Sequence, residues 1–280
     1  MPELPEVETV RRVLKNDLVG RKIKNIEVRY KNIISNDLDY FLSKVCGKTI
    51  TDIKRYAKFL IIELNGNDKY GFILSHLRME GKYFYLPTNT LDNKHIHVIY
   101  HLDNGYDLLY QDVRKFGRME FKSYDELYIT KPLNEIGYDL VLTDFNEDIK
   151  KEILDKINKK KLPIKTILLD QSIMAGLGNI YVDEVLFTSS INPHKAGNLI
   201  KKEELDKIID ASIKILNKAI ELKGTTIRSY TSSLGVEGGY QNLLKVHTKS
   251  ECPNCMEPLC CDKIGGRSTY YCRRCQKWRK

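Results

Sequence analysis

The sequence predicts an α+β fold in which a strand-rich half is followed by a helical half and a short cysteine-bearing tail. Three observations support this fold class. Residues 22–124 contain six short runs rich in β-branched and aromatic residues, separated by Gly, Asn and Asp. Residues 147–222 contain four runs with apolar residues at helical spacing. Six of the seven cysteines fall within residues 252–275.

A helix is expected at the amino terminus, because apolar residues recur at helical spacing at Leu4, Val7, Val10 and Leu14. Pro5 suits the first turn of this helix, and Glu6 and Glu8 suit the positive end of its dipole. Pro2 lies outside the helix. Helix formation therefore does not explain why proline directly follows the initiator methionine.

The strand-rich segment predicts a β-sandwich or a flattened barrel. Its six runs span residues 22–30, 49–64, 69–77, 81–86, 95–112 and 117–124. Asp103-Asn104-Gly105 separates two alternating runs and is a strong hairpin signal. Several antiparallel strands with one helix are typical of a sandwich.

The composition changes near Lys131, where the helical segment begins. Its four runs span residues 147–160, 163–171, 179–187 and 202–222. Paired glycines within 175–181 interrupt two of these helices, and Gly224 suits the end of the last one. We therefore expect three parts, an amino-terminal domain, a helical domain and a tail, at 1–131, 132–244 and 245–280.

The charge balance favours a polyanionic partner such as nucleic acid. Lys and Arg total 46 against 37 Asp and Glu, giving a net charge of +9. A merely solubilising surface is the alternative, but basic residues cluster at 159–161 and at the carboxy terminus. No apolar stretch is long enough to span a membrane, and the amino terminus has no apolar signal region. We expect a cytoplasmic protein without a membrane partner.

Two CxxC pairs near the carboxy terminus predict one structural zinc ion. The ligands would be Cys252, Cys255, Cys272 and Cys275, with 16 residues between the pairs. This spacing lets two knuckles, joined by a β-hairpin, close a tetrahedral site with no open coordination position. The hairpin carries Arg267, which is either a solvated charge or a contact to a polyanion.

Several motifs, in order along almost the whole chain, resemble the bacterial formamidopyrimidine-DNA glycosylases, or MutM family. They include "PELPEVETVRR", "RYAKFLIIEL", "SHLRMEGKY", "QDVRKFG", "IKTILLDQSIMAGLGNIYVDEVLF", "KGTTIRSY" and "CPNC…GGRSTYYCRRCQ". The resemblance implies a β-sandwich with an amino-terminal helix, then a helix-two-turn-helix domain with a four-cysteine zinc finger. It also implies excision of oxidised purines (formamidopyrimidine and 8-oxoguanine) from duplex DNA, followed by AP lyase cleavage by a monomeric enzyme.

The resemblance gives Pro2 a chemical role. Methionine before proline is commonly removed, so Pro2 would become the terminal secondary amine. An α-amino group titrates near 8 and a lysine near 10.4, so far more of the terminal amine is neutral at pH 7. This amine would form a Schiff base with the sugar, and Glu3 would transfer the necessary protons. Glu6 either supports the amine or merely favours the helix start.

The resemblance implies two further catalytic residues and three that replace the extruded base. Lys58 and Arg267 would grip phosphates and assist the lyase steps. The chemistry requires the damaged nucleotide to leave the duplex. Met79, Arg114 and Phe116 would fill the resulting space, with Arg114 facing the orphaned cytosine.

Additional DNA contacts are implied at His95, Lys161 and Asn179, with Lys165 as a weaker candidate. Asn179 follows two glycines at an expected helix start, where free backbone N–H groups favour an anion. The Gly- and Ser-rich residues 226–240 correspond to the family's lesion-covering loop.

Two alternatives remain open at this stage. An endonuclease VIII-like enzyme for oxidised pyrimidines usually begins "PEGPE", whereas this chain has Leu4 at the glycine position. A non-catalytic zinc-ribbon DNA-binding protein would need neither Pro2 nor Glu3. The chain also departs from the family pattern in having "IGYDLVL" (136–142) in place of "LGPEPL", and Lys115 within "RKFG".

Overall fold

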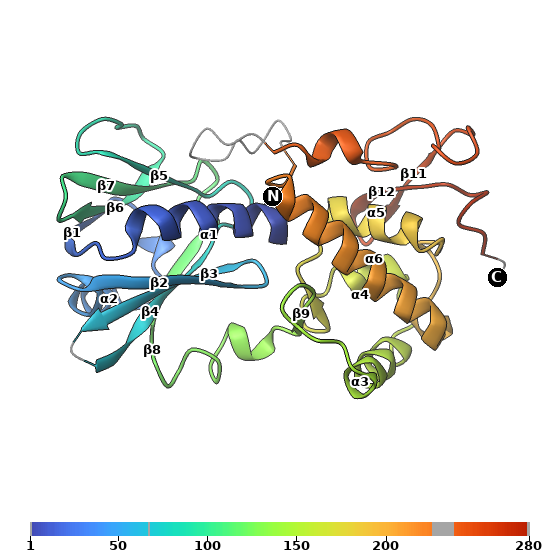
Figure 1. Cartoon of the computed structure of the whole chain (residues 1–280), viewed down its shortest axis with the longest axis horizontal. Coiled ribbons are helices and arrows are strands. Elements are labelled where there is room, and N and C mark those ends of the chain that lie inside the picture. Colours follow the sequence, from blue (N-terminus) through green and yellow to red (C-terminus); the bar gives the residue numbers. More distant parts are fainter. Residues whose placement is uncertain (1, 67, 226–237, 279–280) are drawn as a thin grey trace. The chain divides into compact units, whose positions relative to one another are not determined.

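The computed structural model describes residues 2–66, 68–225 and 238–278 (Figure 1). The chain divides into two compact units. The first comprises Met1–Asn134 with Lys223–Gly238, and the second comprises Glu135–Leu222 with Gly239–Lys280. The segment after the last long helix thus returns to the first unit before the chain enters the tail.

Two antiparallel four-stranded sheets form the first unit and confirm the predicted sandwich. The order in one sheet is β1 (Ile23–Val28), β6 (Ile96–Leu102), β7 (Tyr106–Gln111) and β5 (Lys82–Pro87). The other sheet has the order β2 (Thr49–Tyr56), β3 (Phe59–Gly66), β4 (Asp68–His76) and β8 (Arg118–Ser123). Residues 103–105 connect β6 to β7 as the predicted hairpin turn.

Helix α1 (Leu4–Leu18) contacts both sheets, through β2 and β3 of one and β5 of the other (Figure 1). Its apolar face, including Val7, Val10 and Leu14, is buried in the core between the sheets. Burial of these side chains removes apolar area from water and fixes the helix against the sandwich.

A second helix in this unit, α2 (Leu38–Val45), was not predicted, nor was the 3₁₀ turn η1 (Lys31–Ile33). Asp37 begins α2 by accepting a hydrogen bond from the Tyr40 N–H at 3.0 Å. Phe41 and Val45 are buried on its inner face. Leu38, Phe41, Leu42 and Val45 have helical spacing, so the sequence carried a signal for α2 that our interpretation missed.

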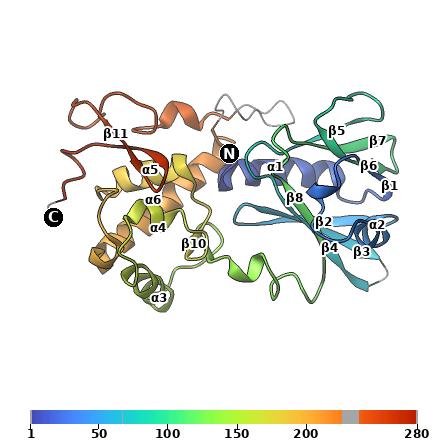
Figure 2. The same ribbon diagram turned by 180° about the vertical axis from the view of Figure 1, so that it is seen from behind.

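The second unit contains the four predicted helices. These are α3 (Glu147–Asn158), α4 (Ile164–Leu168), α5 (Asn179–Thr188) and α6 (Lys202–Glu221). Short 3₁₀ turns are η3 (Gly197–Leu199) and η4 (Tyr240–Leu243), and η2 (Leu133–Glu135) spans the boundary between the two units in the sequence. Helix α5 packs against α6 and against the tail hairpin of β11 (Cys260–Ile264) and β12 (Arg267–Tyr271), as Figure 2 shows from behind. Within the described residues, no helix is long and apolar enough to cross a membrane.

The unusual segment 136–142 forms a short parallel strand pair. In it, β9 (Tyr138–Asp139) pairs with β10 (Met174–Ala175). A Cβ atom at Gly137 would lie 2.3 Å from the Ile173 carbonyl oxygen, so this approach requires glycine. The fully buried Asp139 accepts hydrogen bonds from two following backbone N–H groups at 2.8 and 2.9 Å. The strand pairing and the Asp139 carboxylate together hold this segment.

Candidate active site

The start of α1 is held by the Glu6 carboxylate. One Glu6 oxygen accepts a hydrogen bond from the Glu3 N–H at 2.8 Å. The other accepts from the Thr225 N–H at 2.8 Å and from the Thr225 hydroxyl at 3.1 Å. Pro2, Glu3 and Glu6 are all buried. Glu6 therefore fixes the backbone beside Pro2 to a segment more than two hundred residues away.

Gly224 makes the contact between Glu6 and Thr225 possible. Its φ is +81°, and a Cβ atom there would lie 2.5 Å from the Glu6 carboxylate. Only glycine combines this backbone conformation with such a close approach. Gly224 thus has a second role besides following the end of α6.

Lys58 lies in the tight turn between β2 and β3, where Ala57 has a φ of +51°. The buried Arg55 guanidinium donates to the Ala57 carbonyl at 2.8 Å and to the Glu8 carboxylate at 3.2 Å. Because Glu8 belongs to α1, this contact docks the turn that carries Lys58 onto the amino-terminal helix. Lys58 itself is only 6% exposed.

The Glu8 carboxylate is the negative charge that neighbours Arg11, Arg12 and Arg55. Burial alone would raise its pKa, but hydrogen bonds from Arg11 and Arg12 and the charges of Arg11 and Arg55 outweigh that effect and lower the pKa below its usual value. Arg11 and Arg12 each approach a Glu8 oxygen at 2.8 Å. Glu8 therefore remains ionised at neutral pH.

His76, at the end of β4, is a candidate that the sequence interpretation missed. Burial, together with the positive charges of Arg78 and Lys58, lowers its pKa to about 3. Its Nδ1 accepts a hydrogen bond from the Arg78 N–H at 2.9 Å, so the neutral ring carries its proton on Nε2. His76 thus adds an uncharged donor near Lys58. Its place in "SHLRMEGKY", three residues before Met79, was the available signal.

Two turns lie next to each other around the Tyr110 hydroxyl. One follows β4 and carries Met79, and the other follows β7. A Cβ atom at Gly81 in the first turn would lie 2.3 Å from the Tyr110 oxygen, and one at Gly117 in the second would lie 1.7 Å from it. Tyr110 is fully buried. The two glycines therefore let both turns close over a single tyrosine.

The second turn displays Arg114 and Phe116 from a rigid base. The buried Asp112 carboxylate accepts hydrogen bonds from the Arg114 N–H at 3.0 Å and the Gly117 N–H at 2.7 Å. The Arg114 guanidinium carbon lies 4.8 Å from the centroid of the Phe116 ring, and Phe116 is 48% exposed. The Asp112 N–H donates to the His95 carbonyl at 3.0 Å, which connects His95 to the same turn. We name residues 112–117 the wedge turn.

In the second unit, Asn179 and Lys165 both contact the tail hairpin next to Arg267. The Asn179 side-chain amide donates to the Ser268 carbonyl at 3.0 Å, and the Lys165 ammonium donates to the same oxygen at 2.8 Å. Arg267 is exposed at the start of β12. Lys161 is exposed just after α3.

The suggestion that Lys165 contacts phosphate is wrong. The side chain is 0% exposed, and its ammonium makes a 2.8 Å ion pair with the equally buried Asp183 carboxylate. An ammonium enclosed in this way cannot reach a ligand in solvent. Lys165 instead holds the backbone at Ser268.

Adjacent acids on α5 anchor the beginning of the tail. Asp183 pairs with the His247 ring nitrogen at 2.8 Å and accepts from the Tyr270 N–H at 3.3 Å. Glu184 accepts hydrogen bonds from three consecutive N–H groups, at residues 245–247. These contacts neutralise buried carboxylates with fixed donors. They also fix the direction in which the tail leaves the helices.

The four CxxC sulfur atoms lie within 4.8 Å of one another and could hold a metal ion. Cys252 and Cys275 are 3.7 Å apart, and Cys255 and Cys272 are 3.5 Å apart. A disulfide would need about 2.05 Å. Tetrahedral ligands at a metal–sulfur distance of about 2.3 Å would be separated by roughly 3.8 Å, so the geometry fits a four-thiolate metal site.

The candidate residues are distributed over the two units. The first unit holds Pro2, Glu3, Lys58, Met79, His95, Arg114 and Phe116, and the second holds Lys161, Asn179, Arg267 and the four cysteines. Residues 226–237 of the expected lesion-covering loop lie outside the described part of the chain.

Family models for the formamidopyrimidine-DNA glycosylase N-terminal domain and H2TH domain match residues 1–119 and 136–231. The chain is 45% identical to the formamidopyrimidine-DNA glycosylase of Streptococcus mutans and 41% identical to that of Streptococcus pneumoniae, covering at least 99% of both chains in each case. It is similar to Lactococcus lactis Fpg (MutM) bound to DNA containing N7-benzyl-Fapy-dG (TM-score 0.90) or an abasic site (0.91). Each is 39% identical, with 99% of this chain and 100% of the other covered.

Replacing Asp183 by Asn should leave the Lys165 ammonium buried without its counter-charge. We expect the free energy of unfolding to fall by about 3–5 kcal/mol. Urea unfolding followed by circular dichroism at 222 nm measures this change. The double variant Lys165→Met/Asp183→Asn should recover part of the loss, because the unpaired charge is removed. A cost below about 1 kcal/mol for Asp183→Asn would contradict a stabilising role for the pair.

Proposed function

This chain belongs to the bacterial formamidopyrimidine-DNA glycosylase family, and we propose that it excises oxidised purines from duplex DNA and then cleaves the strand as an AP lyase. Formamidopyrimidine and 8-oxoguanine are the proposed substrates. The observation that carries this proposal is the buried Pro2–Glu3 pair, whose backbone the Glu6 carboxylate holds at the start of α1.

Pro2 is the proposed nucleophile, after removal of Met1. At pH 7, about 10% of an ordinary α-amino group is neutral, compared with roughly 0.04% of a lysine. The amine nitrogen forms a bond to the sugar C1′ while the bond from C1′ to the damaged base breaks. Sugar-ring opening then gives an iminium ion, whose positive charge acidifies the C2′ proton. Loss of this proton expels first the 3′ phosphate and then, by a second elimination, the 5′ phosphate.

Glu3 is the proposed proton-transfer residue. It is adjacent to the amine, and a hydrogen bond to the Glu6 carboxylate holds its backbone in place. Its carboxyl group would protonate the sugar ring oxygen and later accept a proton. Lys58, on the turn docked to α1, and Arg267, on the tail hairpin, would hold the phosphates that flank the lesion. Both are positively charged side chains on backbones with defined anchors.

Met79, Arg114 and Phe116 are proposed to replace the extruded nucleotide. Phe116 is a large exposed apolar side chain on a rigid turn, which suits insertion between base steps. Arg114 would donate hydrogen bonds to the orphaned cytosine. Three additional DNA contacts are proposed: His95 next to the wedge turn, the exposed Lys161 after α3, and Asn179, which bonds to the backbone beside Arg267.

One structural zinc ion is proposed at Cys252, Cys255, Cys272 and Cys275. Four thiolates leave no coordination position for a substrate, so the ion would stabilise the tail and would take no part in the reaction. Its contribution is to hold the hairpin that presents Arg267. We further propose that the protein acts as a monomer on bacterial DNA in the cytoplasm.

The pyrimidine-directed alternative is not favoured. The Streptococcus mutans and Streptococcus pneumoniae relatives are formamidopyrimidine-DNA glycosylases. Leu4 occupies the position at which endonuclease VIII-like enzymes usually have glycine. A purely DNA-binding role would leave the fixed Pro2–Glu3 pair without a use.

If Pro2 is the nucleophile, borohydride should trap a covalent complex with a duplex that contains 8-oxoguanine opposite cytosine. Peptide mapping should place the adduct at residue 2 of this numbering. Glu3→Gln should suppress excision by at least tenfold, because proton transfer is lost. Duplex binding should remain, because the positive charges that attract DNA are unchanged. An adduct at Lys58, or full activity of a chain blocked at its amino terminus, would overturn the mechanism.

Arg114→Ala should lose excision of 8-oxoguanine more severely than cleavage of a preformed abasic site. The reason is that filling the duplex matters most when a base must be extruded. Single-turnover rates on the two substrates measure the difference, with Arg114→Lys as a variant that keeps the charge but loses the guanidinium fork. Equal losses on both substrates would make Arg114 a general phosphate contact.

Removal of the proposed zinc ion by a strong chelator should weaken duplex binding more than it unfolds the rest of the chain. Cys272→Ser should have the same effect, because the four cysteines organise only the tail. Fluorescence anisotropy measures binding, and circular dichroism at 222 nm measures helix content. Cys261→Ser, on the same hairpin but outside the cluster, is the matched control. Loss of most helix signal on chelation would refute this local role.

A further inference from the structure

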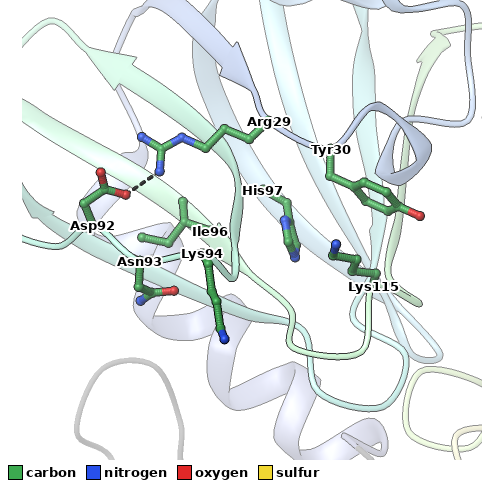
Figure 3. A pocket seen from close by; sticks show the side chains of 8 residues that line it. All are labelled: Arg29, Tyr30, Asp92, Asn93, Lys94, Ile96, His97 and Lys115. Atoms are coloured by element: carbon green, nitrogen blue, oxygen red, sulfur yellow. Dashed lines mark hydrogen bonds and ion pairs between the residues drawn. The ribbon is translucent and has the colours of Figure 1, made fainter.

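A pocket of about 420 Å³ opens beside the wedge turn and contains none of the proposed catalytic or DNA-contact residues (Figure 3). It lies in the first unit, between the end of β1, the segment before β6, and the wedge turn. Its lining is polar and basic, and comprises Arg29, Tyr30, Asp92, Asn93, Lys94, Ile96, His97 and Lys115. A ligand of this pocket would need polar, anionic groups.

Two lysines supply the uncompensated charge. Lys94 and Lys115 are exposed, and neither makes an ion pair with an acid among the described residues. Arg29, in contrast, forms ion pairs with both Glu27 and Asp92, so its positive charge is already compensated. In the view of Figure 3, Lys115 lies beside the His97 ring, Lys94 lies on the other side of it, and the Arg29 side chain runs toward Asp92.

The walls of the pocket are fixed by hydrogen bonds. The buried His97 ring bonds to the Asp112 carbonyl at 2.8 Å through Nε2, which must be the donor because a carbonyl only accepts. Asn93 accepts from the His95 N–H at 2.9 Å and donates to the Gln111 side chain at 3.1 Å. The segment that carries Lys94 and the turn that carries Lys115 are therefore held in place.

The wedge turn sends consecutive side chains to different places. Lys115 has a φ of +58°, and its ammonium lies 4.7 Å from the centroid of the Tyr30 ring in the pocket. Its neighbours Arg114 and Phe116 instead pack on each other. A duplex that receives Arg114 and Phe116 would bring its backbone past Lys115.

We propose that Lys94 and Lys115 bind a backbone phosphate of the strand opposite the damaged base. The strand follows from Arg114, the neighbour of Lys115, which would face the orphaned base of that strand. This inference rests on the proposed function. It adds a phosphate site that would hold the undamaged strand while the other strand is distorted.

The test compares the full-length protein with Lys94→Gln/Lys115→Gln on a duplex containing a tetrahydrofuran abasic analogue. Each phosphate contact contributes about 0.9 to the slope of log affinity against log salt. We expect the variant to reduce the slope by about 1, because one phosphate contact is lost. The control Lys24→Gln/Lys214→Gln removes two exposed charges from β1 and α6 and should change the slope by less than about 0.5. An equal slope in the two double variants would overturn the proposal.

Neutral methylphosphonate linkages, placed one at a time, identify the strand. At one or two positions opposite the lesion, the substitution should weaken binding by the wild-type protein and have little effect on the Lys94→Gln/Lys115→Gln variant. The same pattern on the damaged strand alone would refute the strand assignment. If no position distinguishes the proteins while inorganic phosphate raises the melting temperature of the wild type only, the pocket binds free phosphate and the proposal is wrong.

Excision separates this inference from the proposed function. At saturating protein, the single-turnover rate on 8-oxoguanine should be similar in the wild type and in Lys94→Gln/Lys115→Gln, because the pocket contacts no reacting atom. Absence of excision by the wild-type protein would refute the proposed function, whatever the salt slopes show. Normal excision with unchanged slopes would refute the phosphate site alone.

Discussion

The Glu6 carboxylate is the contact on which the amino-terminal site depends. It joins the N–H of Glu3 to Thr225, a residue 219 positions further along the chain. Both oxygens of this buried group are used, so the cost of removing a carboxylate from water is met by fixed donors. Residues this close to a chain terminus, such as the proposed nucleophile Pro2, would otherwise fray, since terminal residues have few constraints. Burial of α1 in the sandwich and the Glu6 bridge together remove that freedom.

In the second unit, buried carboxylates likewise anchor the tail by accepting hydrogen bonds from distant residues. Asp183 and Glu184 are adjacent on α5, and their oxygens accept from Lys165, His247 and several backbone N–H groups. A tail of about forty residues has little apolar area to bury, so the polar anchors and a bound metal ion would supply what its core lacks. In both units, buried acids position a basic residue that lies elsewhere: Lys58 in the first and Arg267 in the second.

The wedge turn shows how rigidity and exposure are combined. The Asp112 carboxylate accepts hydrogen bonds from two N–H groups of the turn. Gly81 and Gly117 allow the two neighbouring turns to close over Tyr110. The buried base leaves Phe116 exposed in a fixed position, as insertion into a duplex requires. The same base orients Lys115 toward the basic pocket. Consecutive residues of this one short turn thus leave it in different directions, Arg114 and Phe116 to one place and Lys115 to another.

The sequence by itself determined the strand runs, the four helical runs of the second unit, the hairpin at 103–105 and the CxxC cluster, because these depend on local period, turn chemistry and ligand spacing. Our interpretation of the sequence missed α2, although Leu38, Phe41, Leu42 and Val45 have helical spacing, and it gave the wrong environment for Lys165. Only the tertiary structure decided that Lys165 is a buried partner of Asp183, that His76 lies near Lys58, and that Glu6 reaches Thr225. These outcomes depend on contacts between distant segments, and the burial of a charged side chain is set by the surroundings that those contacts create.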